Sequence, residues 1–181
     1  MSENSTRIKT GKVRFCYVKV FKPEQDDAGV NKYKVCILID KKDKKTIKAI
    51  QAAIDAATEK GVAEKWGGKT PKNLAIPLRD GDEEKDGDEF KSCYFINAST
   101  KMKPTVIDAD GEELDAESFY SGCYGKVIIN FFAYDNKGKK GVGCGLGNIL
   151  KIEDGERLGG GSSDAYSDFD DEIKGASDLA D

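Results

Sequence analysis

Apolar and polar residues alternate along several stretches of this chain, which is the pattern of strands that bury one face. The first is residues 11–21 (GKVRFCYVKVF), and residues 32–39 (KYKVCILI) follow as the second half of a long hairpin. The period of two gives the first strand two faces, with Cys16, Val18 and Val20 on one and Phe15, Tyr17, Lys19 and Phe21 on the other. Further strands are predicted over residues 90–99, 105–108, 122–134 and 141–152.

Residues 43–60 change to the helical period. Their apolar positions recur at spacings of three and four residues, at Ile47, Ile50, Ile54 and Ala57. Gly61 is predicted to end this helix, because glycine is the usual residue just past a helix C-terminus. The apolar stripe predicts that the helix packs on the sheet or closes one end of a barrel.

About five strands and one helix, with glycines in the last strand that favour bulges or tight corners, predict a mainly β fold. The best match is a five-stranded, OB-fold-like antiparallel barrel with one main α-helix. Residues 1–10 are expected to form a flexible N-terminus and residues 11–158 the barrel domain. Residues 159–181 are predicted to be a Gly/Ser linker and a disordered acidic C-terminal tail.

Composition excludes several classes of protein. The chain has no histidine, which excludes His-based catalytic triads and His-ligated metals. Its five cysteines are single, without CxxC spacing, so neither a disulfide framework nor a zinc knuckle is expected. No apolar run approaches the roughly 18 residues of a membrane span, and residues 1–10 lack a secretory signal. These features predict a soluble, non-exported protein of a reducing cytoplasm.

The acidic residues are concentrated in three segments, residues 80–89, 108–117 and 162–181. Lysine and arginine predominate elsewhere, so a chain of net charge −4 consists of a cationic body with anionic loops and an anionic tail. Cationic surfaces bind polyanions, and a tethered acidic tail competes for the same surface. The alternative is that these charge runs serve only solubility.

Lysines and aromatic residues share faces of the predicted strands. Proteins that bind single strands track the phosphates with cations and stack the bases on flat rings. The predicted DNA-binding residues on strands are Tyr17, Lys19, Lys91, Phe95, Asn97, Tyr124, Lys126, Asn130, Phe132 and Tyr134, and those in loops are Lys101, Lys103, Lys139 and Lys140. The alternative is that the rings belong to the core and the lysines are merely solvated.

The two internal acidic segments raise the question of a metal site. Residues 82–93 resemble an EF-hand loop in part, but Cys93 occupies the last position, where a bidentate glutamate is required. Two carboxylate clusters could instead hold Mg²⁺ for phosphodiester cleavage, although their spacing does not select this chemistry. No metal or cofactor is therefore predicted, and a Mg²⁺-dependent nuclease stays an alternative.

The C-terminal tail places apolar anchors among its acids. The segment predicted to bind partners is Asp168, Phe169, Asp170, Asp171 and Glu172. A purely solubilising tail needs no aromatic residue, whereas charge and a spaced apolar anchor together suit docking to another protein. An inert tail is the alternative.

Five blocks of sequence carry a resemblance to a known family: NKYKVCILIDKKDKKTI, PLRDGDEE, YFINA, YSGCYGKVIINFFAY and GVGCGLGNILKIEDGERLGG, followed by an acidic tail containing DF. In their order and spacing, over roughly residues 11–169, the chain resembles the bacteriophage OB-fold single-stranded DNA-binding proteins, long catalogued as a domain of unknown function.

The resemblance implies an OB-fold that binds single-stranded DNA without sequence specificity in phage DNA replication or recombination. It implies no catalysis and no cofactor, and it locates the protein in the cytoplasm of the infected bacterial host. By analogy with other replication proteins, the tail would contact phage or host replication proteins. A structural phage accessory protein is a further alternative, and the sequence leaves open whether the chain forms homo-oligomers.

Overall fold

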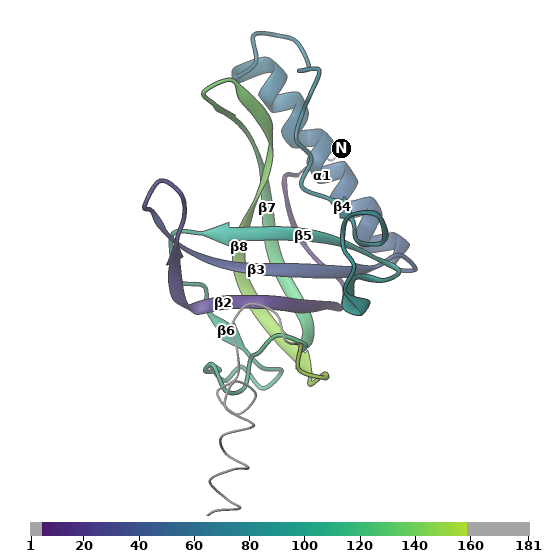
Figure 1. Ribbon diagram of the computed structural model, residues 1–181, viewed down its shortest axis with the longest axis vertical. Helices are drawn as coiled ribbons and strands as arrows, with labels where there is room; N and C mark the ends of the chain where they lie inside the picture. The colour runs from purple at the N-terminus through teal and green to yellow at the C-terminus, as the bar shows by residue number, and fades with distance from the viewer. Residues whose placement is uncertain (1–4, 159–181) are drawn as a thin grey trace, which may run out of the picture.

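The computed structural model describes residues 5–158 and consists mainly of β-strands (Figure 1). The strands are β1 (Arg7–Lys9), β2 (Val13–Gln25), β3 (Asn31–Asp40), β4 (Arg79–Asp80), β5 (Cys93–Thr100), β6 (Val106–Ile107), β7 (Tyr124–Asn136) and β8 (Lys139–Glu153). The helices are α1 (Lys44–Glu64), the short α2 (Gly81–Glu84) and the 3₁₀ helix η1 (Asp88–Phe90).

Five of the strands close into a ring in the order β7-β2-β3-β5-β8, and β8 pairs again with β7. Figure 1 shows β2, β3 and β5 side by side, with β7 and β8 crossing them and α1 beside the outer part of the β7–β8 hairpin. The predicted five-stranded barrel with one main helix is confirmed. It is antiparallel except at one place, because the ring closes through a single parallel pairing of β5 with β8.

Strand β2 contains a bulge that the alternation does not reveal. Tyr17 has a φ of 49°, in the left-handed region, and the register with β3 shifts between Cys16 and Lys19. Phe15 and Val20 therefore both lie in the main core, although strict alternation would separate them. The predicted assignment of β2 to two alternating faces is wrong, because a bulge adds a residue to one strand and reverses the alternation after it.

Helix α1 buries the predicted stripe, and the side chain of Asp43 caps its N-terminus by accepting from the Thr46 N–H. The prediction that Gly61 ends the helix is wrong. The helix continues past Gly61, which packs so closely that a Cβ there would lie 2.6 Å from the Cβ of Ala133 and 2.7 Å from the Trp66 ring. The glycine therefore serves close packing of the helix on β7.

The first acidic segment is folded onto the barrel. The Nζ atom of Lys41 lies 2.7 Å from both Asp80 Oδ1 and Asp82 Oδ2, which fixes the start of α2 to the end of β3. Phe90, at the end of η1, then covers a second apolar cluster on the outside of the barrel. The members of this cluster are Cys16, Cys36, Leu38, Phe90 and Phe95. We call residues 79–90 the acidic brace.

The ends of the chain differ from the sequence analysis in one respect. Arg7–Lys9, expected in a flexible N-terminus, forms β1 and pairs with β7. The predicted linker and acidic tail lie outside the described residues. Within residues 5–158, no helix is long and apolar enough to cross a membrane.

Candidate nucleic-acid interface

The outer face of β2, β3 and β5 is hollowed by a cavity of about 430 Å³, which we call the β3–β5 hollow. Its lining residues are Tyr17, Lys19, Glu24, Lys34, Val35, Cys36, Asn97, Ala98 and Ser99. In OB-folds, the face of the second and third barrel strands binds oligonucleotides. In this ring those strands are β3 and β5, so the hollow is the candidate interface.

Strand register brings the polar side chains of the hollow together. Lys19 lies opposite Lys34, and Lys34 lies opposite Ser99 on the next strand. Asn97 lies opposite Cys36. Residues directly opposite one another project from the same face of a sheet, so these side chains share one surface. Three of the predicted residues, including Tyr17 at the bulge, therefore meet here.

A carboxylate lies between the two lysines of the hollow. Glu24 is paired with Lys19 and also lies 3.8 Å from the Nζ atom of Lys34. The hydrogen bond from Lys19 lowers the pKa of Glu24, so this carboxylate is ionised at neutral pH. Two ammonium groups around one anion form an arrangement that also suits a phosphate.

The bulge directs Tyr17 onto this surface. Next to the bulge, the backbone N–H of Val18 donates to Ser121 Oγ at 3.0 Å. The Tyr17 ring packs against Phe90, with centroids 6.3 Å apart, and Leu158 packs on the same outer cluster. Burial raises the pKa of Tyr17, so its phenol is uncharged at neutral pH and does not repel phosphates.

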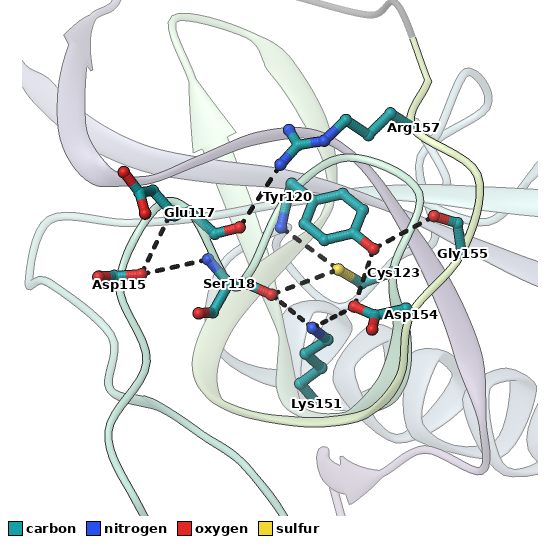
Figure 2. A network of polar contacts seen from close by, with 9 residues as sticks. All are labelled: Asp115, Glu117, Ser118, Tyr120, Cys123, Lys151, Asp154, Gly155 and Arg157. Atoms are coloured by element: carbon teal, nitrogen blue, oxygen red, sulfur yellow. Dashed lines mark hydrogen bonds and ion pairs between the residues drawn. The ribbon is translucent and has the colours of Figure 1, made fainter.

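A polar network fixes the turn that carries Ser121 to the segment after β8 (Figure 2). The Tyr120 hydroxyl donates to Asp154 Oδ1 at 2.8 Å, and the Arg157 guanidinium lies 4.2 Å from the centre of the Tyr120 ring. Hydrogen bonds from Lys151 and then from Tyr120 lower the pKa of Asp154, which keeps it ionised. The network therefore holds the turn that carries Ser121, whose Oγ accepts the hydrogen bond from Val18 next to the bulge.

Two aromatic rings lie over glycines on the outer face of β7 and β8. A Cβ on Gly143 would lie 2.7 Å from the Phe132 ring, and one on Gly141 would lie 2.6 Å from the Tyr134 hydroxyl. The rings therefore rest on the β8 backbone. Phe132 is 46% exposed, and Asn130 beside it is exposed as well. An exposed ring on a flat backbone is a suitable platform for a base.

Two predicted residues lie away from the hollow, on or under the acidic brace. Phe95 is fully buried beneath Phe90, and the cations of Arg79 and Lys85 lie 5.2 and 5.4 Å from its ring centre. Its ring has no face open to a base. Lys91 projects outward and pairs with Asp88 at 3.0 Å.

Two other predicted residues lie near the start of β7. The Tyr124 ring is in contact with two cations, since Lys12 and Arg14 lie 5.3 and 5.2 Å from the ring centre. It is separated from Phe132 by roughly 27 Å along the extended strand. Lys126 faces outward on the same part of the strand. The structure does not bring these two residues to the β3–β5 hollow.

The predicted loop lysines lie at the edges of the barrel. Lys101 and Lys103 are exposed in the loop that follows Thr100, the residue of β5 that pairs with the start of β3. Lys139 and Lys140 open β8 after a two-residue turn between β7 and β8. Both pairs extend the cationic surface beyond the hollow.

Three residues of the candidate site were not predicted from the sequence: Lys34, Glu24 and Ser121. Lys34 lies two residues before Cys36 in the predicted strand over residues 32–39, so the two side chains share a face. Assigning the faces of that strand would have placed Lys34 on the outer one. Glu24 and Ser121 gave no signal, because their roles depend on the bulge and on contacts between segments distant in the sequence.

The acidic segments do not form a metal centre in the described part of the chain. Within residues 5–158, no group of three or more acidic or cysteine side chains is placed to hold a metal ion. In the second acidic segment, Asp108 and Asp115 instead accept hydrogen bonds from backbone N–H groups of their own turns. These carboxylates therefore organise their own loops.

The chain is similar to known phage proteins over most of its length. The model of the family described as "Enterobacter phage Enc34, ssDNA-binding protein" matches residues 6–179. Protein p50 of Acyrthosiphon pisum secondary endosymbiont phage 1 is 33% identical over 177 residues, which cover 91% of this chain and 93% of that protein.

Solved structures agree with this assignment. The single-stranded DNA-binding protein from bacteriophage Enc34 in complex with ssDNA is 26% identical, with a TM-score of 0.76, over 88% of this chain and 96% of that one. The single-stranded DNA-binding protein gp2.5 of bacteriophage T7 has a TM-score of 0.61 at 17% identity, over 92% of this chain and 93% of that one, and shows that the fold is shared.

Proposed function

This chain belongs to the family of phage single-stranded DNA-binding proteins described for Enterobacter phage Enc34, and we propose that it holds the DNA strand in the β3–β5 hollow. The family consists of binding proteins, not enzymes. In this proposal Lys19 and Lys34 contact phosphates, Tyr17 and Phe132 stack bases, and no base edge is read. The observation that supports it most is the meeting of Tyr17, Lys19, Lys34 and Asn97 around one hollow.

The biological role we propose is coating of single strands during phage DNA replication or recombination, in the cytoplasm of the infected host. Binding through phosphates and stacking is tolerant of sequence, because every nucleotide has a phosphate and every base has a flat face. The loop lysines, at Lys101, Lys103, Lys139 and Lys140, would attract the strand to the edges of the barrel.

We assign recruitment of replication partners to the acidic tail, through Asp168, Phe169, Asp170, Asp171 and Glu172. The last described residue, Leu158, packs on the same outer cluster as Tyr17. In this proposal the acidic tail covers the cationic surface when DNA is absent and leaves it when DNA binds.

The test is the affinity for an oligothymidine as a function of salt, measured by fluorescence anisotropy with a duplex competitor. Lys19→Ala and Lys34→Ala should each lower the slope of log affinity against log salt by about 0.7, the value for one phosphate on a single strand. Tyr17→Ala should weaken binding by about 1–3 kcal/mol, the range for loss of one stacked base.

Lys48→Ala is the matched control, because Lys48 is an exposed lysine on α1 and is not part of the hollow. A salt slope that is flat in the wild type, or equal in all the lysine variants, would contradict the proposed phosphate contacts. Incubation of labelled single strands with Mg²⁺ tests the nuclease alternative, since a binding protein shifts the strand and leaves its length unchanged.

A further inference from the structure

A second groove lies between α1 and β7, on the other side of the exposed Phe132 ring. Its cavity is about 250 Å³, and its lining includes Thr6, Lys60, Lys65, Asn130 and Phe132. Both lysines are exposed and come from the last part of α1 and the residue that follows it. The groove therefore combines two cations, polar side chains and an aromatic ring, as the first hollow does.

The strand pairings connect this groove to the β3–β5 hollow. Successive cross-strand partners form one row across six strands: Lys19, Lys34, Ser99, Gly145, Asn130 and Arg7. Adjacent strands are about 4.8 Å apart, so the row follows the curved surface of the barrel for roughly 24 Å. It begins in the hollow and ends beside Thr6, whose hydroxyl donates to Asn130 Oδ1 at 3.2 Å.

The middle of the row, at Gly145, has no side chain that projects from the sheet. Gly145, where β8 pairs with Ser99 of β5, has no side chain and faces outward. The Phe132 ring lies over Gly143 and reaches to within 3.9 Å of the position that a Cβ on Gly145 would occupy. A strand crossing Gly145 would thus have a flat backbone beneath it and an exposed ring beside it.

We propose that the groove between α1 and β7 is a second DNA subsite, which takes the strand after it has crossed Gly145. Lys60 and Lys65 contact its phosphates, and Phe132 stacks a base between the two subsites. Glu64 also lines the groove and offsets part of this charge. The proposal rests on the proposed function, because it extends the same strand from the β3–β5 hollow.

The experiment compares oligothymidines of about 4 and about 12 nucleotides, the lower and middle part of the range for one OB-fold. The double variant Lys60→Glu with Lys65→Glu should leave the affinity and salt slope of the short strand unchanged. For the long strand it should lower the salt slope by about 1.4, the value for two phosphates. The control is Lys45→Glu with Lys48→Glu, an equal charge change in the first turns of the same helix.

Gly145→Leu provides a second, uncharged test. A Cβ at this position meets no atom closer than 3.5 Å, so the backbone accepts a side chain there, and an outward leucine would obstruct the path between the subsites. It too should weaken only the long strand. Equal salt slopes for the long strand in the Lys60/Lys65 variant and in the control would overturn the second subsite. Unchanged binding of both strands in Lys19→Ala and Lys34→Ala would instead overturn the proposed function.

Discussion

Glu24 lies between Lys19 and Lys34, at the position where the proposed mode of binding places a phosphate. In the absence of DNA it neutralises part of their charge, which keeps two neighbouring ammonium groups from repelling each other. When DNA binds, a phosphate must displace this carboxylate or share the lysines with it. In the proposed mode of binding, Glu24 therefore lowers the affinity of the hollow for DNA while it holds the lysines in position.

We predict that Glu24→Gln binds single-stranded DNA more tightly than the wild type, by about two- to five-fold, the range for one exposed ion pair. The gain should appear mainly in the association rate at low salt, because the added attraction acts at long range. Stopped-flow association with a labelled oligothymidine measures it. Asp27→Asn, in the exposed β2–β3 loop, is the charge-matched control. An equal gain in affinity in both variants would show that Glu24 has no specific role.

Individual residues are also where prediction from the sequence was weakest. The outward positions of Asn97 and Phe132 follow from strand alternation, which holds wherever a strand is regular. Tyr17 and Lys19 also face outward, although the predicted alternation of their strand was wrong, because the bulge shifts the register between Cys16 and Lys19. The burial of Phe95 could not be predicted, since the residues that cover it belong to the acidic brace and not to its own strand.

At the scale of elements, the acidic brace has a structural role, because it binds Lys41 and covers the outer apolar cluster. Its carboxylates at Asp80 and Asp82 bind Lys41, and its last residue, Phe90, closes the outer cluster next to Tyr17. Hydrogen bonds from Lys41 lower the pKa of both carboxylates. Their contribution to stability is therefore fully present above the unfolded pKa, near 3.9, and is lost as the pH falls through the lower folded-state values.

We predict that Lys41→Met lowers the free energy of unfolding at pH 7, and that the difference from the wild type shrinks as the pH falls through the lowered pKa values of Asp80 and Asp82 in the folded protein. Once both carboxylates are protonated, the wild type has also lost the ion pair. Urea denaturation at pH 7 and at a series of lower pH values measures this. Lys42→Met, an exposed neighbour, is the control and should have little effect at any of these pH values. A Lys41→Met deficit that persists at low pH would assign the effect to packing.

Elements were predicted better than their ends. The helical stripe on α1 and the main strands follow from periodicity, because each buries one face in a common core. The effect of Gly61 was not predictable from local sequence: glycine ends helices and also permits close packing, and only the position of Ala133 and Trp66 decides between them. Residues 80–89 were expected to be a loop and Phe90 to begin the strand over residues 90–99, because the local pattern does not show that Phe90 packs on the outer cluster.

For the whole molecule, the order of the strands in the ring brings residues from different strands together on one surface. It places lysines from β2 and β3, a glycine from β8 and an asparagine from β7 in one continuous row. The barrel itself could be predicted from the number and spacing of strands, but this row could not, since it depends on the register of every pair. The parallel pairing of β5 with β8 is the step that joins the two halves of the row.

The charge distribution gives a last prediction, at the scale of the whole chain. Deletion of residues 162–181 should increase affinity for single-stranded DNA at low salt, because a tethered polyanion competes with DNA for the cationic surface. The gain should diminish as salt rises, since the Debye length falls from about 30 Å at 0.01 M to about 10 Å at 0.1 M.

A full-length variant in which Asp168, Asp170, Asp171 and Glu172 are replaced by their amides separates charge from length. If the tail acts through charge, this variant should reproduce much of the gain of the deletion, whereas a tail that acts through bulk alone would leave it like the wild type. Phe169→Ala should leave DNA affinity unchanged, because we assign that ring to partner proteins and not to the DNA surface. Affinity that is equal in the wild type and the deletion at every salt concentration would contradict competition by the tail.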